Sequence, residues 1–298
     1  MPDLTIIIVT YNSSNIILTA LKKLNFQKYK IIIVDNNSTD DTVLLIKKNF
    51  PDALIIQNNK NCGFARANNI ALKETKTEFA LILNPDCFIE ENDIEKVIKV
   101  MKNNSRIALA SAVCHNCVLD KNQQLINIHA CPVSQRNLLT NKGDFSIAKF
   151  VSGACMFMRI STYKKIGFFD ENFFLYCEDN ELNKRTKKRG YDIAVANGAK
   201  FYHLSGQSSD LESRNLYFIQ WHKFGWSKMY YTQAVHNKLI AKLKAIRKIT
   251  EILIKMVIDL IKYKKIALSN KATLSGSFAY LIGLKAFDKK GNPRKSII

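Results

Sequence analysis

Short apolar runs alternate with helix-like segments in the N-terminal part of the chain, and this alternation leaves few folds open. The apolar runs cover residues 4–9, 31–34, 53–56 and 79–83, and helix-like segments at 15–24, 42–50 and 65–73 separate them. Short buried strands that alternate with helices form parallel sheets with helices on both faces. The sequence therefore predicts an α/β fold with a mostly parallel sheet.

Polar side chains follow three of these runs at the point where each run ends. In open parallel sheets, ligands bind at the carboxyl ends of the strands, so these positions are the first candidates for a binding site. The three groups are Thr10-Tyr11-Asn12, Asp35-Asn36-Asn37 and Asn84-Pro85-Asp86.

Helix capping is a second interpretation of the polar cluster after residue 34. Ser38 can act as an N-cap, with Asp41 three residues further on and a helix-like segment next. Capping explains Ser38 and Asp41. It does not explain Asp35, which follows the apolar run directly and remains a candidate ligand-binding residue.

The region from 150 to 205 again shows a regular pattern, whereas residues 106–150 do not. A helix is predicted over residues 178–189, because the segment opens with Glu178 and Asp179 and ends in basic residues before Gly190. That order suits the helix dipole and a glycine C-cap. Strands are predicted within 150–160, at 193–196 and at 200–203.

The C-terminal region is helical and basic. Residues 211–298 contain 18 lysines and arginines against four acidic residues, and the whole chain carries a net charge of +20. Such a basic region points to a polyanionic partner, either nucleic acid or acidic lipid. An amphipathic helix is predicted over 240–262. Its apolar positions are Ile240, Leu243, Ile246, Ile249, Leu253, Met256 and Leu260, and its polar stripe is Lys244, Lys248, Glu251, Lys255, Asp259 and Lys262.

Several classes of protein are disfavoured. The N-terminus lacks the basic start of a secretory signal, and its apolar run is short and β-branched. The chain contains no stretch of 18 uncharged apolar residues, so no transmembrane helix is predicted. Seven scattered cysteines favour reduced thiols, as in the cytosol, over a disulfide framework.

Two weaker patterns have alternative interpretations. Cys114 and Cys117, with His129 and Cys131 nearby, have part of the spacing of a zinc site, although thiols that pack in the core are the default. The segment "WHKFGW" at 221–226 could touch lipid headgroups or an acceptor, but helix packing explains it more simply.

Seven segments in order carry a family resemblance: "VTYNS", "VDNNSTDDT", "NKNCGFARANN", "LNPDC", "VSGACMFMR", "GFFDENFFLYCEDNEL" and "HLSGQSS". Over about residues 4–210 the chain resembles glycosyltransferase family 2, the inverting enzymes of GT-A fold, and within it the rhamnosyltransferase-like branch. The resemblance implies a Rossmann-like domain at 1–210, with a nucleotide-sugar half to about 110 and an acceptor half after it. The basic helical extension at 211–298 follows.

The resemblance also implies a metal site. Asn84-Pro85-Asp86 stands where the family has an Asp-x-Asp motif, so Asp86 would bind Mg²⁺ or Mn²⁺ on the donor diphosphate. Asn84, placed among the donor-binding residues, replaces one carboxylate. The position of His203 can be a second ligand in the family, and imidazole suits Mn²⁺ better than Mg²⁺.

Donor and acceptor roles follow in the same way. Asp35 would accept a hydrogen bond from N3–H of uracil or thymine, with Thr10, Tyr11 and Asn12 beside the base. Arg66 would contact the diphosphate, unless it is a solvated helix-face residue. Asp179 would be the general base that takes the proton of the acceptor hydroxyl, and Glu178 would tune it.

The expected function is metal-dependent, inverting transfer of rhamnose or a hexose from a dTDP- or UDP-sugar to a lipid-linked or growing surface glycan. The basic C-terminal region would dock on an anionic membrane, on the cytoplasmic face of the inner membrane. Helical packing or a homo-oligomer contact is the second interpretation of this region, and specific nucleic-acid binding is the least favoured because only charge supports it.

Two other functions are weighed against this one. A nucleotidyltransferase can share a similar sheet, but it would need a Gly-rich phosphate loop after the first strand, where this chain has "TYNSSNI". A non-catalytic protein that binds a nucleotide sugar or a polyanion is the other alternative. The presence of Asp86, Asp179 and His203 argues against it.

Overall fold

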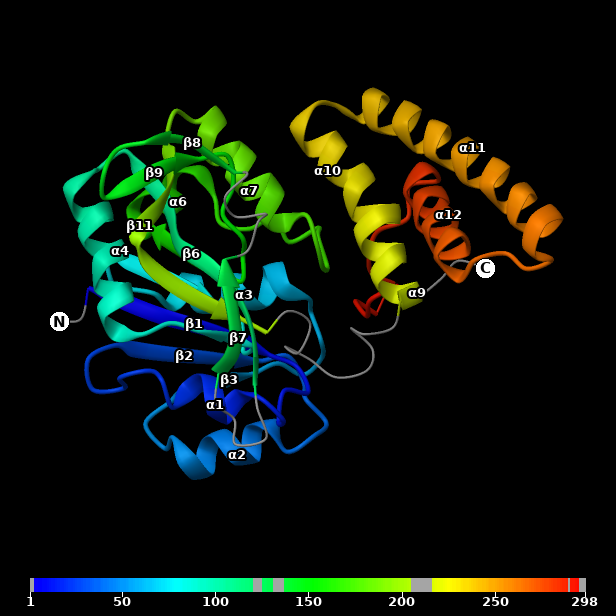
Figure 1. Cartoon of the computed structure of the whole chain (residues 1–298). Coiled ribbons are helices and arrows are strands. Elements are labelled where there is room, and N and C mark those ends of the chain that lie inside the picture. The colour runs from blue at the N-terminus through cyan, green and yellow to red at the C-terminus, as the bar shows by residue number, and fades with distance from the viewer. Residues whose placement is uncertain (1–2, 120–124, 131–136, 205–215, 289, 295–298) are drawn as a thin grey trace. The chain divides into compact units, whose positions relative to one another are not determined.

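The structure, a computed structural model, describes residues 3–119, 125–130, 137–204, 216–288 and 290–294. The chain forms two compact units (Figure 1). The sheet unit comprises Met1–Asn59, Ala67–Phe169 and Leu182–Ser209, and the helical unit comprises Lys60–Arg66, Asp170–Glu181 and Asp210–Ile298.

The sheet unit begins with the predicted alternation of strands and helices. Its first four strands pair in parallel in the order β3-β2-β1-β4. Their apolar runs are continuous because the central strands are buried on both faces. The elements are β1 (Leu4–Thr10), α1 (Ile17–Leu21), β2 (Lys30–Asp35), α2 (Thr42–Asn49), β3 (Leu54–Gln57), α3 (Phe64–Glu74) and β4 (Phe79–Leu83).

The same sheet continues beyond β4 with a strand of opposite direction. Strand β10 pairs antiparallel with both β4 and β6, and β6 pairs parallel with β11. The full order is β3-β2-β1-β4-β10-β6-β11-β9-β8, with β5 on β11 and β7 on β6. The elements are β5 (Cys87–Phe88), α4 (Glu91–Asn103), β6 (Ile107–Leu119), β7 (Leu125–Ala130), β8 (Leu138–Asn141), β9 (Phe145–Ala148), β10 (Cys155–Arg159), α6 (Ile160–Ile166), α7 (Glu178–Lys188) and β11 (Asp192–His203).

Three predicted element boundaries are wrong. The strands expected at 193–196 and 200–203 form one strand, β11, whose pairing with β6 shifts register between Ala196 and Lys200. Such a bulge absorbs extra residues without ending the strand. The helix expected at 15–24 is limited to α1. The N-cap of α2 is Asp41 rather than Ser38.

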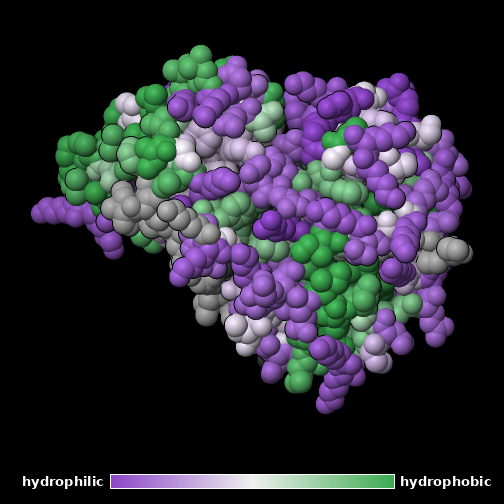
Figure 2. Space-filling view, turned by 180° about the vertical axis from the view of Figure 1, so that it is seen from behind, coloured by the Kyte–Doolittle hydropathy of each residue, from purple (hydrophilic) through white to green (hydrophobic). Residues whose placement is uncertain are grey.

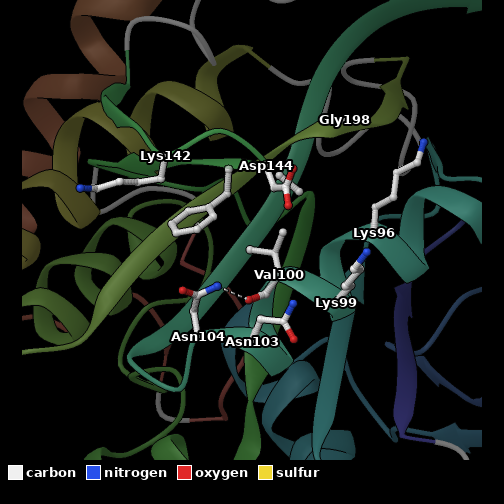
Figure 3. Close-up of a pocket in the computed structure, with 10 residues that line it drawn as sticks. Lys96, Lys99, Val100, Asn103, Asn104, Lys142, Asp144 and Gly198 are labelled. Carbon is white, nitrogen blue, oxygen red and sulfur yellow. Dashed lines mark hydrogen bonds between the residues drawn. The ribbon is translucent and has the colours of Figure 1, made fainter.

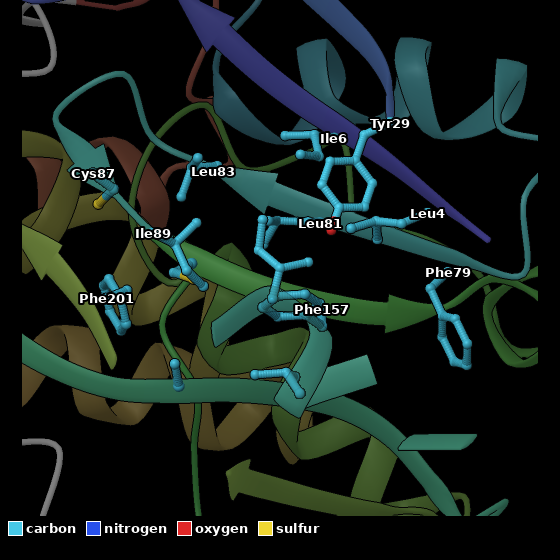
Figure 4. Close-up of a cluster of buried hydrophobic side chains, with 14 of the residues drawn as sticks. Leu4, Ile6, Tyr29, Phe79, Leu81, Leu83, Cys87, Ile89, Phe157 and Phe201 are labelled. Atoms are coloured by element: carbon cyan, nitrogen blue, oxygen red, sulfur yellow. The ribbon is translucent and has the colours of Figure 1, made fainter. Parts of the chain in front are cut away.

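One hydrophobic core of the sheet unit covers one face of the central strands (Figure 4). Ile6 and Ile8 point into it, together with Leu81 and Phe157 from the neighbouring strands. Alternate residues of a strand point to opposite faces, so Ile7 is buried on the other side. Each fully buried side chain of this size stabilises the fold by ~1.5–3 kcal/mol.

The helical unit has a second core. Its centre is Trp221, which is fully buried and donates from Nε1 to Ser275 Oγ at 3.1 Å. The two tryptophans of "WHKFGW" are therefore buried in helix packing, the simpler of the two interpretations, whereas Phe224 is exposed. The elements are α9 (Leu216–Ile219), the π-helical segment η1 (Gln220–Ser227), α10 (Lys228–Val235), α11 (Lys238–Tyr263) and α12 (Leu268–Leu281).

Helix α12 crosses η1 at two glycines. A Cβ on Gly276 would lie 2.5 Å from the Trp221 carbonyl oxygen and 3.0 Å from Gly225 Cα. Only residues without a side chain allow the two backbones to approach this closely. The sequence did not predict α12, because its small residues are buried on several sides and leave no apolar stripe of period 3.6.

Candidate active site

The ends of β1 and β2 hold Asp35 in a fixed orientation. The parallel register places Thr10 beside Asp35, and Thr10 Oγ1 donates to Asp35 Oδ1 at 3.1 Å. Ser38 donates from its backbone N to Oδ2 at 3.0 Å and from Oγ to Oδ1 at 2.5 Å. The Asp35 carboxylate is thus buried and oriented at the carboxyl edge of the sheet. Ser38, predicted as a helix cap, serves this carboxylate instead.

Asn12 links the loops that follow β1 and β2. Its φ of 49° is left-handed, a conformation that asparagine tolerates. Its Oδ1 accepts from Thr39 N at 2.8 Å, and its backbone N donates to Ser38 Oγ at 2.9 Å. Asn12 therefore shapes the wall beside Asp35 by holding the neighbouring loop. Tyr11, between Thr10 and Asn12, is half-buried.

Asp86 and His203 meet where β5 pairs with β11. The antiparallel register sets His203 opposite Cys87, the residue after Asp86. His203 Nε2 lies 3.6 Å from Asp86 Oδ2, and the ligand atoms of Asp86, Cys87 and His203 all lie within 4.8 Å of one another. Asp86 is fully buried, whereas His203 is partly exposed. The acidic residue in the turn after the apolar strand β4 thus lies beside an imidazole.

The donor set at this cluster fits a hard divalent cation in part. A carboxylate oxygen suits Mg²⁺ and Mn²⁺, and an imidazole nitrogen suits Mn²⁺ better. The Cys87 thiol is a soft ligand, and burial, with the charge of Asp86 next, raises its pKa well above the ordinary value. Asp86 and His203 are therefore the two residues that could hold such an ion, and the remaining ligands would be oxygens from outside the chain.

Backbone hydrogen bonds of Asn84 and Cys87 fix the loop that carries Asp86. Asn84 is half-buried, its backbone N donates to Ala154 O at 2.9 Å, and its carbonyl accepts from Cys87 N at 3.0 Å. The turn after β4 is fixed by these bonds. Sequence reasoning missed Cys87, although its place beside Asp86 in "LNPDC" was a signal.

Within the described part of the chain, Cys114 and Cys117 belong to no group of side chains that could hold a metal ion. Cys114 packs against the main core, whereas Cys117 belongs to a separate small cluster with Phe88 and Leu204. Cys131 lies outside the described residues. The structure thus supports packing thiols at Cys114 and Cys117, and burial raises the pKa of Cys117 to about 11.

Glu178 and Asp179 open helix α7 in two different environments. Glu178 is 6% exposed, and its Oε2 has no hydrogen-bond partner within the described part of the chain. Burial raises the pKa of Glu178 to about 8, and the charge of Asp179 adds to the shift. Asp179 is half-exposed, and its Oδ1 accepts from Asn180 N at 2.8 Å.

The backbone before this pair is strained. Tyr176 and Cys177 have φ values of 69° and 70°, and consecutive left-handed residues other than glycine are uncommon. Such strain persists only where the surroundings fix it, and it often marks functional loops. Ser227 Oγ donates to Leu175 O at 2.9 Å, which anchors the loop to the start of α10.

Arg66 forms an ion pair that the sequence did not suggest. Its Nε lies 3.2 Å from Glu171 Oε2, and its side chain is 55% exposed. Phe64 N also donates to Phe174 O at 2.9 Å. The "GFAR" segment is therefore bonded to the "DENFF" segment, and both belong to the helical unit.

One cavity in the sheet unit contains none of the predicted site residues (Figure 3). It has a volume of about 260 Å³, and Lys96, Lys99 and Lys142 line it together with Asp144. Asn104 Nδ2 donates to Val100 O at 2.9 Å in its wall. The predicted site residues lie elsewhere in the chain.

A comparison with protein-family models decides the family. The model described as "Glycosyl transferase family 2" matches residues 5–167, which is more than half of the chain. The chain belongs to glycosyl transferase family 2. The matched segment includes the ends of β1, β2 and β4, where Asp35 and Asp86 lie.

Curated relatives in this family include rhamnosyltransferases. The chain is 24% identical over 207 residues to the low-salt glycan biosynthesis hexosyltransferase Agl10 of Haloferax volcanii, a match that covers 65% of this chain and 64% of the relative. It is 27% identical over 217 residues to the O-antigen chain rhamnosyltransferase WbaN of Salmonella anatum, covering 68% and 66%. It is 21% identical over 237 residues to the N-acetylglucosaminyl-diphospho-decaprenol L-rhamnosyltransferase of Mycobacterium tuberculosis, covering 69% and 77%.

These matches support the rhamnosyltransferase-like branch of the family. The chain spans just under two thirds of the length of the first two relatives. Among solved structures, GalNAc-T7 with UDP, GalNAc and Mn²⁺ matches with a TM-score of 0.53 at 12% identity, over 78% of this chain and 50% of that one. This likeness confirms the GT-A type of fold, with a helical region after it.

Proposed function

We propose that the chain transfers a sugar from a dTDP- or UDP-sugar to a hydroxyl of a lipid-linked or growing surface glycan, with inversion at the anomeric carbon. The transferred sugar is rhamnose or a hexose. The observation that carries this proposal is the buried Asp86 beside His203, at the strand end where family 2 members have their metal motif. The donor-side Asp35 supports it.

Asp86 and His203 would hold the divalent cation, which when bound neutralises charge on the leaving nucleoside diphosphate. Asp35 would orient the base. Among the described residues its Oδ2 accepts from Ser38 N alone, so a lone pair remains for N3–H. Thymine and uracil present the same N3–H edge, so this contact serves either nucleotide.

Asp179 would take the proton from the acceptor hydroxyl as that oxygen attacks the anomeric carbon. A single base with direct displacement inverts the configuration, so no carboxylate nucleophile is required. Glu178, with its pKa raised to about 8, would be mostly protonated at neutral pH. It would then place little like charge beside Asp179, whose carboxylate would act as the base.

The lipid-linked acceptor has two lines of support. The mycobacterial relative is named for a diphospho-decaprenol acceptor. In this chain, α11 turns an apolar face to solvent: Leu243 is 59% exposed, Ile254 57% and Ile261 79%. Its buried side is formed by Ala241, Ala245 and Ile252.

We therefore propose that this face docks on an anionic membrane surface. Figure 2 shows apolar side chains gathered on the C-terminal helices, at the upper left of the view. Lysines flank them, and basic residues outnumber acidic ones by 18 to four in residues 211–298. Lipid anions attract such a surface with about 1 kcal/mol per basic residue. No helix within the described ranges is long and apolar enough to cross a bilayer.

Calorimetry with a panel of dTDP- and UDP-sugars, with and without Mn²⁺ or Mg²⁺, tests the proposal. Metal-dependent binding of one donor by the native chain, lost in Asp86→Ala, is the expected result. Donor turnover onto a lipid-linked acceptor would then exclude a purely binding protein. A failure of every donor to bind under every metal would contradict the proposed function.

A further inference from the structure

The helical unit contains a second cavity, which the transfer chemistry does not use. It has a volume of about 310 Å³ and lies between α10 and α11. Phe224 and Met229 supply apolar surface, and four of the seven lining residues are cationic. The lining residues are Phe224, Lys228, Met229, Lys244, Arg247, Lys248 and Glu251.

The charges around this cavity are only partly neutralised. Arg247 Nε lies 2.9 Å from Glu251 Oε1, and Lys248 Nζ lies 3.8 Å from Glu251 Oε2. Glu251 is the single acid among the described residues that line the cavity, so three positive charges of this lining are left over. Like charges held close together repel one another, and an anion bound among them would reduce this repulsion.

Lys244 is held by a hydrogen bond to α10. Its Nζ donates to Thr232 Oγ1 at 3.0 Å, which turns the ammonium toward α10. Burial lowers the pKa of Lys244 below its ordinary value, and the charge of Lys228 adds to the shift. Both effects would be relieved by a negative charge in the cavity.

The cavity is also next to the predicted catalytic loop. Lys228, Lys244 and Lys223 each lie close enough to Cys177, the residue before Glu178, for their charges to bear on the pKa of its thiol or to be affected by it. Ser227, adjacent to Lys228, donates to Leu175 O at 2.9 Å. All of these residues belong to the helical unit, so the cations and the acidic pair share one body.

The flank of α11 that carries the cations borders its exposed apolar face. Arg247 lies one turn after Leu243, which is 59% exposed, and residues four apart on a helix are neighbours. An anion that arrives on a lipid would thus meet cations and apolar surface on the same helix. A free sugar nucleotide has no hydrocarbon chain that could pack on the apolar surface.

We propose that this cavity binds the diphosphate of a polyprenyl-diphosphate-linked acceptor and holds its glycan close to Glu178 and Asp179. The inference rests on the proposed function for its acceptor, but the binding is separable from turnover. Arg247 offers a planar guanidinium that can grip two phosphate oxygens, and Lys228 and Lys244 offer point charges.

Vesicle binding by the full-length chain tests this site without any turnover. Three vesicles are compared in EDTA, which removes metal-dependent donor binding: phosphatidylcholine alone, phosphatidylcholine with phosphatidylglycerol, and phosphatidylcholine with a polyprenyl diphosphate. The native chain should prefer the diphosphate vesicles, and Lys244→Gln/Arg247→Gln should weaken that preference about tenfold, as expected for lost charged hydrogen bonds. Lys164→Gln/Lys165→Gln, exposed on α6 and matched in charge, should keep it.

Equal losses on phosphatidylglycerol and on polyprenyl diphosphate would overturn the assignment, because they would show a general attraction to phosphate headgroups. Unchanged binding of the diphosphate vesicles by Lys244→Gln/Arg247→Gln would overturn it as well. If that variant does not fold, Lys228→Gln, which removes one cation of the same cavity, takes its place. In turnover assays the pocket variants should raise the KM for the lipid-linked acceptor and leave the donor KM unchanged. If no donor ever reacts, the vesicle result still decides whether the site exists.

Discussion

Nε2 of His203 lies 3.6 Å from Oδ2 of Asp86, although 117 residues separate them in the sequence. The short strand β5 makes this possible, because it pairs with the end of β11 and sets Cys87 opposite His203. His203 is thus positioned by strand pairing, and Asp86 lies in the turn directly before β5. Sites fixed by regular elements hold their geometry more tightly than sites on loops.

Replacement of His203 should weaken metal binding without unfolding the chain. We expect His203→Ala to lower Mn²⁺ affinity at least about tenfold. Mutation of a residue that only supports a metal ligand already lowers metal affinity about 10–100-fold. Calorimetric titration with Mn²⁺ in the presence of the donor is the measurement. His236→Ala, an exposed histidine of the helical unit, is the control. Equal affinity in native chain and His203→Ala would remove His203 from the site.

Asp179→Asn should abolish most of the transfer rate. Loss of a general base lowers kcat on the order of 10²–10⁴-fold, and the donor KM should hardly change because Asp179 is assigned to the acceptor. Steady-state kinetics with the cognate donor provide both values. Asp179→Glu, which keeps a carboxylate, should recover part of kcat. Native kcat in a folded Asp179→Asn variant would refute the base assignment.

Glu178 should make the stability of the chain depend on pH. Its folded-state pKa, about 8, lies above the ordinary 4.5, so the folded state binds the extra proton between these values. The resulting stability is present below about pH 4.5 and is lost as the pH rises through about 8. The melting temperature of the native chain should therefore fall from about pH 5 to about pH 9 more steeply than that of Glu178→Gln.

Glu74→Gln, an exposed carboxyl on α3, is the control for that experiment. It should keep the native slope of melting temperature against pH. If Glu178→Gln also keeps the native slope, the carboxyl of Glu178 is not buried in solution in the way the structure shows.

Most of the parallel half of the sheet could be predicted from the sequence. β1, β2, β3 and β4 follow from local apolar runs, and the helix at 178–189 follows from its charges and Gly190. The antiparallel half could not be predicted, since β6, β8 and β9 have mixed patterns that make sense only beside their partners. β10 in particular separates β4 from β6, a pairing that no local pattern encodes.

The candidate site shows the same limit. The resemblance singled out Asp86 and His203, and the structure brings them together. It did not reveal that Ser38 and Thr10 orient Asp35, because both bonds depend on the register of β1 against β2. Nor could it reveal that Glu178 is buried while Asp179 is half-exposed, since burial at a helix start depends on the packing of distant segments.

The crossing of η1 and α12 should tolerate no side chain. Gly276→Ala would place a Cβ 2.5 Å from a backbone oxygen of Trp221, which cannot move aside easily. We expect a loss of ~1–3 kcal/mol in the free energy of unfolding, typical of overpacking. Denaturant unfolding measures it. Ser277→Ala next to it should be nearly neutral, because the buried Ser277 Oγ has no hydrogen-bond partner among the described residues.

The exposed apolar face of α11 should contact the membrane. Removal of everything after residue 235 would be a poor test of membrane docking, because Ala241, Ala245 and Ala272 belong to the core of the helical unit. Point variants on the outer face avoid this problem. Ile254→Glu/Ile258→Glu should reduce flotation with anionic vesicles about tenfold or more, since it replaces two apolar contacts with charges that the lipid repels.

Leu44→Glu on α2 provides the matched control, because Leu44 is 66% exposed and lies in the sheet unit. It should float as the native chain does. The competing occupant of the face is a second copy of the chain, and sedimentation separates the two cases. If Ile254→Glu/Ile258→Glu converts a dimer into a monomer and leaves vesicle binding intact, the face is a subunit interface and the membrane docks elsewhere. If it abolishes flotation and leaves the sedimentation coefficient unchanged, the apolar face of α11 is the lipid contact.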